Sequence, residues 1–167
     1  MSRLIARTAE WFALTGGALL VAVVLVTATN VGAFALDRAA RLLGGNVAGL
    51  PGYEDFVRLA MSCAVLMMLP WCQLRHGHVA VDLFVDMLGR RMRIVTAVLS
   101  TLGTVALALF LAWWMALGLL ETRADGTLSR VLGWPEWPFY APGVVSLLLW
   151  AAVAASQLPE AARDGTA

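Results

Sequence analysis

Long apolar runs separated by short polar segments dominate the chain. A helix needs about 20 apolar residues to cross the hydrocarbon core of a bilayer, which is about 30 Å thick. The runs predict spanning helices at about residues 11–36, 56–74, 94–120 and 139–158. Because the remaining segments are too short to fold as a soluble domain, we expect an all-α integral membrane protein in which residues 1–167 form a single membrane domain.

A shorter helix is predicted between the second and third spans, at about residues 79–91. Asp82, Asp86 and Arg90 recur every four residues, and leucine, phenylalanine and methionine fill the opposite side. A helix of this length cannot span the bilayer, but its two-sided character is typical of the membrane interface. We therefore predict a short interfacial amphipathic helix there.

The composition agrees with a membrane location. The chain is 60% hydrophobic and 14% charged, and its mean hydropathy is +0.79. Arg3 and Arg7 precede the first run as in a secretory signal, but the run exceeds the 7–15 apolar residues of a signal peptide, so we expect a retained helix. The net charge of +1 gives no indication of a basic surface that binds nucleic acid.

The distribution of arginine predicts the orientation, because short cytoplasmic loops collect positive charge. The chain contains no lysine. With the N-terminus inside, the loop between the second and third spans carries a cluster of arginines on the cytoplasmic side: Arg75, Arg90, Arg91 and Arg93. We therefore expect both termini in the cytoplasm.

The second span begins with charged residues, which are costly in hydrocarbon. Glu54 and Arg58 are four residues apart, so they share a helical face and can pair with each other. The pair is either an anchor of the helix end in the headgroup region or a contact with another membrane protein. Asp55, one position further, is expected to face the aqueous rim.

The segment before the fourth span combines aromatic residues and prolines. Trp134, Trp137 and Tyr140 suit the headgroup level, where an apolar ring with a polar edge is favoured, while Pro135 and Pro138 hold the chain extended into the fourth span. They form either an interfacial aromatic belt or a docking surface for an extracytoplasmic partner.

No residue pattern indicates catalysis or a cofactor. His76 and His78 have only Asp82 as a nearby third ligand, which is too few for a metal site. Their alternative roles are to hydrogen-bond the backbone carbonyls at the end of the second span or to act as a pH switch. Cys63 and Cys72 are nine residues apart on one helix and project in opposite directions, so they cannot pair. The chain lacks a nucleophile beside a base and a phosphate-binding glycine loop, so we predict no enzyme activity.

The order of these features resembles the small membrane subunit of tripartite ATP-independent periplasmic (TRAP) transporters. The resemblance rests on a second helix opening with Glu54 and Arg58, and on two motifs. These are the helix exit Arg75-His76-Gly77-His78-Val79-Ala80-Val81-Asp82 and the outer-loop stretch Ser129-Arg130-Val131-Leu132-Gly133-Trp134-Pro135-Glu136-Trp137. It covers nearly the whole chain.

The resemblance implies a non-catalytic subunit in the bacterial inner membrane. It would enlarge the static scaffold of a large elevator-type membrane subunit, which takes up an organic acid with the sodium gradient. A periplasmic binding protein would deliver the substrate. Glu54 and Arg58 would support the interface with the large subunit, the corner of Arg75, Gly77, His78 and Asp82 would shape the cytoplasmic end, and the loop with Trp134, Pro135 and Trp137 would help receive the binding protein.

Two other classes of protein have comparable helix content. A stand-alone small multidrug exporter has four helices, but it needs a carboxylate in the middle of a helix, whereas Glu54 lies at an end. A haem-bearing membrane anchor of a redox complex needs histidines on facing helices, whereas His76 and His78 share one segment.

Overall fold

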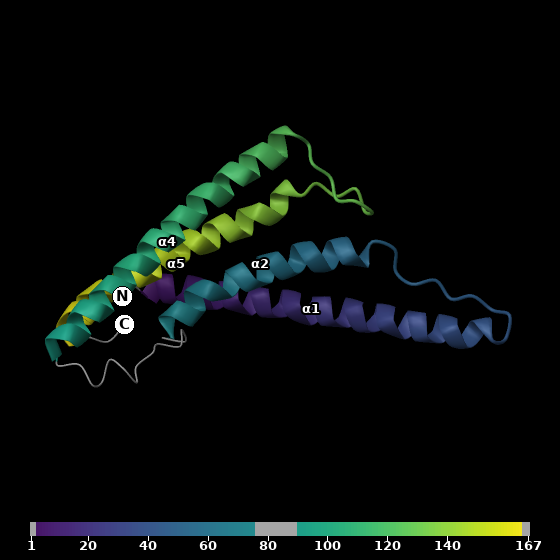
Figure 1. Ribbon diagram of the computed structural model, residues 1–167, viewed down its shortest axis with the longest axis horizontal. Helices are drawn as coiled ribbons and strands as arrows, with labels where there is room; N and C mark the ends of the chain where they lie inside the picture. The colour runs from purple at the N-terminus through teal and green to yellow at the C-terminus, as the bar shows by residue number, and fades with distance from the viewer. Residues whose placement is uncertain (1–2, 76–89, 165–167) are drawn as a thin grey trace.

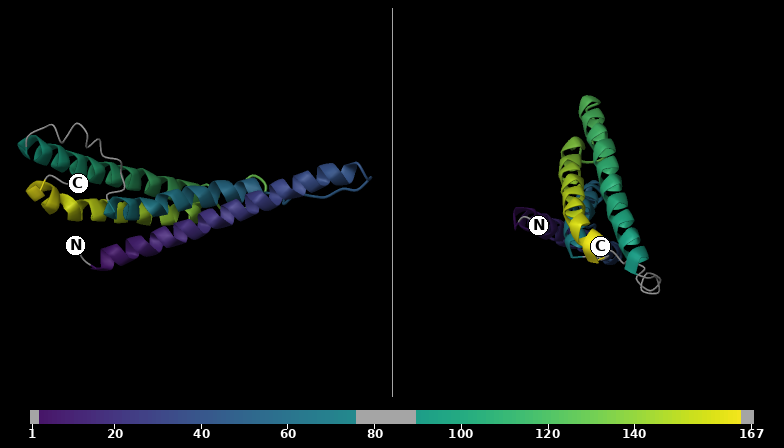
Figure 2. Two further views of the ribbon diagram at one scale, coloured as in Figure 1. Left: turned by 90° about the horizontal axis from the view of Figure 1, so that it is seen from below. Right: turned by 90° about the vertical axis from the view of Figure 1, so that its left-hand side faces the viewer.

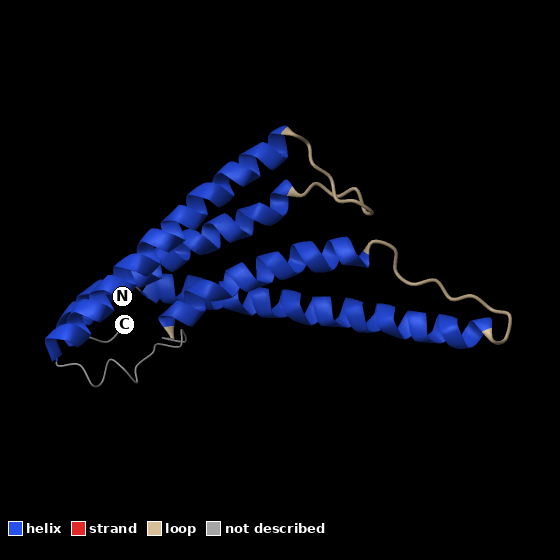
Figure 3. Cartoon of the chain, viewed as in Figure 1, coloured by secondary structure: helices blue, strands red, loops and turns tan. Residues whose placement is uncertain are grey.

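The computed structural model describes residues 3–75 and 90–164, and these form helices and connecting loops without a β-strand (Figures 1 and 3). The helices are α1 (Arg3–Arg41), α2 (Tyr53–Leu74), α4 (Arg90–Ala124), the short 3₁₀ helix η1 (Trp137–Phe139) and α5 (Tyr140–Asp164). All four α-helices are long and apolar enough to cross a membrane, which confirms the predicted number of long apolar helices. The predicted interfacial helix lies outside the described residues except for Arg90 and Arg91, which begin α4.

The helices α1 and α4 extend beyond the apolar runs of the first and third predicted spans. The α1 helix has 39 residues and α4 has 35, or about 58 Å and 52 Å at 1.5 Å per residue. Their polar ends stay helical beyond the apolar part. In the last turn of α1, for example, Arg41 Nε donates to Asp37 Oδ2 at 2.8 Å. The apolar runs therefore predicted the helices but not where they end.

Each helix packs on a limited set of neighbours. The α1 and α2 helices form one hairpin, α4 and α5 form another, and α2 joins them by packing against α5. In the view of Figure 1 the hairpins converge at the end that holds both termini and separate toward the loops 42–52 and 125–136, and Figure 2 shows that the N-terminal end of α1 lies apart from α4 and α5. The result is an open wedge, in which α5 lies between α2 and α4.

Small residues let the outer helices approach their neighbours. The buried residues of α1 recur every seventh position: Ala9, Gly16, Val23 and Asn30. At Gly16 a Cβ would lie 2.9 Å from the carbonyl oxygen of Ala64 on α2, so the two backbones are nearly in contact there. Close approach through small residues is typical of helices in lipid, where no hydrophobic force drives them together.

A polar seam runs along the contact between α2 and α5. Ser146 Oγ donates to the Leu66 carbonyl at 2.6 Å. Deeper along the seam, Gln73 Nε2 donates to Gln157 Oε1 at 2.7 Å, and Gln157 Nε2 returns a hydrogen bond to the Gln73 carbonyl at 3.1 Å. Trp150 Nε1 donates to Gln73 Oε1 at 3.2 Å. These buried groups join the two hairpins where they converge.

The faces of α1 and α4 that contact no other helix of the chain are mainly apolar. Outward-facing side chains of α1 and α4 are half to two-thirds exposed, and they include Val21, Leu25, Phe110, Trp113 and Trp114. In water such surface would be a liability, but toward lipid or another membrane protein it is appropriate.

Candidate subunit-contact site at the loop end of the helices

The carboxylate of Asp55 joins the start of α2 to the tip of the loop 125–136. Its Oδ2 accepts hydrogen bonds from the backbone N–H groups of Val131 at 2.8 Å and Leu132 at 3.0 Å. The residue is only 5% exposed. The expectation that Asp55 faces the aqueous rim was therefore wrong, because the loop folds back over the first turn of α2 and covers it.

The loop owes its shape to a helix stop and a tight turn. Gly126, at φ 62°, ends α4 while the Thr127 N–H donates back to the Thr122 carbonyl at 3.2 Å, as in a Schellman cap. Ser129 then closes the turn, because its N–H donates to the Trp134 carbonyl at 2.8 Å and its hydroxyl accepts from the Trp134 N–H at 3.1 Å. The turn aims the N–H groups at its tip toward Asp55.

Arg58 pairs with Glu136 at the other end of the loop rather than with Glu54. The guanidinium donates to Glu136 Oε1, and the arginine side chain stays 52% exposed while that of Glu136 is 15% exposed. Glu54 is exposed, and within the described residues no ion pair joins it to Arg58. The expected pairing of Glu54 with Arg58 was wrong because Glu136, remote in sequence, competes for the guanidinium.

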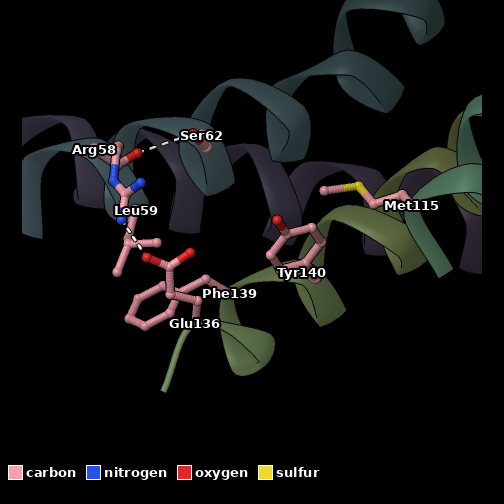
Figure 4. Close-up of a pocket in the computed structure, with 7 residues that line it drawn as sticks. All are labelled: Arg58, Leu59, Ser62, Met115, Glu136, Phe139 and Tyr140. Atoms are coloured by element: carbon pink, nitrogen blue, oxygen red, sulfur yellow. Dashed lines mark hydrogen bonds and ion pairs between the residues drawn. The ribbon is translucent and has the colours of Figure 1, made fainter. Parts of the chain in front are cut away.

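A cleft of about 310 Å³ lies beside this ion pair, between α2, α4 and the start of α5 (Figure 4). Arg58 and Glu136 lie at one end of it, Met115 lies at the other, and the ring of Tyr140 lies between them. The full lining is Arg58, Leu59, Ser62, Met115, Glu136, Phe139 and Tyr140.

The aromatic residues of the loop differ in accessibility. Trp134 is 42% exposed, and Pro135 is exposed. Trp137 is half-buried, and its ring lies under the guanidinium of Arg123 at 5.1 Å, which ties η1 to the last turn of α4. Trp134 and Pro135 thus offer more free surface than Trp137.

At the opposite end, the structure describes only Arg75 of the predicted corner. Arg75 ends α2, and its guanidinium lies 4.7 Å from the centre of the Trp71 ring. Gly77, His78 and Asp82 lie outside the described residues, as does His76.

The two cysteines are free, as the helical spacing predicts. Cys63 is buried, and its thiol donates to the Phe139 carbonyl at 3.0 Å, so it contributes to the contact between α2 and η1. Cys72 is half-buried.

A family model described as tripartite ATP-independent periplasmic transporters, DctQ component, matches residues 39–164. The chain belongs to this family. No curated protein and no solved structure matches it. The match contains all of α2, α4 and α5 together with the loops 42–52 and 125–136, and it confirms the resemblance drawn from the motifs.

As a member of the DctQ family, the chain is the small permease subunit of a TRAP transporter. The family and the four long apolar helices together indicate a multi-pass protein of the inner membrane. A transporter component of this kind is not an enzyme. The loop motif from Ser129 to Trp137 has a structural role in this small subunit, because it supplies the N–H donors for Asp55 and the carboxylate for Arg58.

Sequence reasoning placed Asp55 at the aqueous rim and gave Glu136 no role, so it missed the contribution of both carboxylates to the site. Each of them lies next to a residue that was singled out for another reason, Asp55 beside Glu54 and Glu136 beside Trp137. A partial signal was present, because buried backbone N–H groups require acceptors and the turn that contains Gly133 has such groups at its tip.

Proposed function

We propose that this chain is the non-transporting scaffold partner of a large elevator-type TRAP subunit in sodium-driven uptake of an organic acid delivered by a periplasmic binding protein. The family match over residues 39–164 carries the proposal. A partner of this kind needs apolar outer faces and a rigid frame, and it needs no substrate path of its own. The exposed apolar faces of α1 and α4 and the seam between α2 and α5 support that role.

The interface with the large subunit includes the exposed side of the first turns of α2. Glu54 and Arg58 lie on this side, with the apolar Met61 and Val65 following on the same stripe, 49% and 53% exposed. Charged groups near the end of a spanning helix suit contact with protein rather than with lipid tails. Polar groups there act as attachment points where lipid provides no hydrophobic drive.

The two ends of the molecule have different tasks in this proposal. Both termini and the corner of Arg75, Gly77, His78 and Asp82 face the cytoplasm, where that corner shapes the inner end of the scaffold. The loop with Trp134, Pro135 and Trp137 faces the periplasm and helps receive the binding protein. The arginine cluster at one end and the exposed Trp134 at the other support this orientation.

Co-purification tests the interface. A tagged chain co-expressed with the large subunit encoded in the same genome is expected to retain it, and the double variant Glu54→Ala with Arg58→Ala is expected to lose most of it. Arg41→Ala, which removes another exposed arginine of an ion pair, is the matched control and is expected to co-purify normally. Normal co-purification by the double variant would reduce Glu54 and Arg58 to an anchor of the helix end.

A further inference from the structure

Pro70 interrupts the hydrogen bonding of α2 four residues before the helix ends at Leu74. Proline has no backbone N–H, so the Leu66 carbonyl, four positions earlier, lacks the donor that a helix normally provides. Prolines are tolerated in membrane-spanning helices because serine and threonine side chains, among other groups, replace that donor. The Leu66 carbonyl therefore needs a substitute donor from outside α2.

Ser146 of α5 is the substitute donor. Its hydroxyl donates to the Leu66 carbonyl at 2.6 Å, and the side chains of Ser146 and Pro70 are both fully buried. Ser156, on the same helix, behaves differently, because its hydroxyl donates to the Val153 carbonyl of α5 itself at 2.7 Å. Ser146 thus completes the hydrogen bonding of a neighbouring helix.

A second side chain of α5 supports α2 beyond the proline. The Gln73 carbonyl is among the last four of α2 and lacks an N–H donor within the helix. Gln157 Nε2 donates to this carbonyl at 3.1 Å, and the Gln73 side chain bonds in turn to Gln157 at 2.7 Å and to Trp150 at 3.2 Å. The last turn of α2 therefore receives from α5 the hydrogen bonds that α2 does not supply.

Before the proline, α2 is also held by α1. A Cβ at Gly16 of α1 would lie 2.9 Å from the Ala64 carbonyl oxygen and 3.2 Å from Met67 Cβ. This part of α2 packs closely on α1, whereas the side-chain hydrogen bonds of Gln73, beyond the proline, go to α5. Because helices bend most readily at prolines, Pro70 is the position at which the last turn moves most easily relative to the rest of α2.

From these contacts we propose that residues 71–75, the last turn of α2 with Arg75, form a segment hinged at Pro70 that α5 holds in place through Ser146 and Gln157. In this arrangement α5, rather than the rest of α2, positions Arg75 and the start of the predicted corner. The hairpins stay together when the segment opens, because the loop 125–136 remains tied to the start of α2. The proposal does not depend on the large subunit, since every group involved belongs to this chain.

Amide hydrogen exchange of the purified chain in lipid nanodiscs tests the hinge, because exchange reports the local opening of backbone hydrogen bonds. In Ser146→Ala, the amides of residues 71–75 are expected to exchange about tenfold faster than in the wild type, the effect of losing one buried hydrogen bond. Residues 54–65, before the proline, are expected to keep their wild-type rates. Ser156→Ala is the matched control and is expected to match the wild type throughout, since it removes a hydroxyl that bonds within α5.

Pro70→Ala distinguishes a hinge from a general loss of packing. The substitution returns an N–H donor to the Leu66 carbonyl, so adding it to Ser146→Ala is expected to bring the exchange of residues 71–75 back to near the wild-type rate. A cavity at Ser146 would not be repaired in this way. Gln157→Leu tests the second contact by itself and is expected to raise the exchange of the same residues about tenfold.

Three results would overturn the proposal. The first is unchanged exchange of residues 71–75 in Ser146→Ala or in Gln157→Leu. The second is an equal acceleration of residues 54–65 in these variants, because the loosening would then involve the whole helix. The third is a failure of Pro70→Ala to slow the exchange of residues 71–75 in the Ser146→Ala background.

Discussion

Asp55 has more structural consequence than its neighbour Glu54, although the two carboxylates are adjacent. Asp55 is buried and accepts two backbone hydrogen bonds from the loop tip, whereas Glu54 is exposed. An unpaired N–H in a covered position costs more than the net value of the hydrogen bond it has lost. We infer that Asp55 holds the loop 125–136 against the start of α2, where Glu136 of the same loop pairs with Arg58.

Removing this carboxylate is therefore expected to loosen the loop. In Asp55→Ala, the N–H groups of Val131 and Leu132 lose their acceptor, so limited proteolysis should cleave the loop about tenfold faster than in the wild type. Asp55→Asn keeps a neutral acceptor and should be intermediate. Glu54→Ala is the matched control and should behave as the wild type, and equal cleavage of Asp55→Ala and Glu54→Ala would contradict this role.

Residue partners were the least predictable feature from the sequence. Glu54 and Arg58 were matched by helical spacing, which is a local rule, but the partner of Arg58 is Glu136, 78 positions away. Spacing along a helix shows which groups can meet on that helix. It contains no information on a loop that folds back from another hairpin, and for that reason the partners of Asp55 and the role of Glu136 were not predicted.

At the scale of the helices, the sequence predicted type and number well, because about 20 apolar residues leave few alternatives to a spanning helix. The residues at which the helices begin and end were less predictable, because α1 and α4 continue beyond their apolar runs into polar residues. The packing of α1 was also not predicted, because its buried stripe is only four small or short residues, Ala9, Gly16, Val23 and Asn30, within a helix that is apolar on all sides.

Two adjacent glycines in α1 allow a direct test of this packing. A Cβ at Gly16 would lie 2.9 Å from the Ala64 carbonyl oxygen and 3.2 Å from Met67 Cβ, whereas a Cβ at Gly17 would have the flexible end of Met68 as its nearest neighbour on α2, at 3.8 Å. Gly16→Ala is expected to destabilise the protein by about 1–3 kcal/mol through overpacking. Gly17→Ala is expected to be neutral or to stabilise by about 0.5–1 kcal/mol through helix propensity.

Thermal unfolding in detergent measures both variants under one condition. The two changes add the same methyl group to neighbouring positions of one helix, so a general effect of alanine in α1 cancels in the comparison. Equal melting temperatures for the two variants would show that α1 does not approach α2 through Gly16.

At the scale of the whole molecule, the chain is two helical hairpins joined along one seam. The amides of Gln73 and Gln157 fix the end where the hairpins converge, and the contacts of Asp55 and Arg58 tie the loop 125–136 to α2 where they separate (Figure 1). Contacts at both ends favour a frame that holds its shape. A static partner of a moving subunit needs that property.

The central claim is that this chain is necessary for transport but does not transport by itself, and uptake in reconstituted vesicles tests it most directly. The measurement is sodium-driven uptake of the organic acid bound by the periplasmic binding protein, with that protein present. The account predicts uptake only when this chain and the large subunit are both in the vesicle membrane. Uptake by this chain alone, or undiminished uptake by the large subunit without it, would contradict the account.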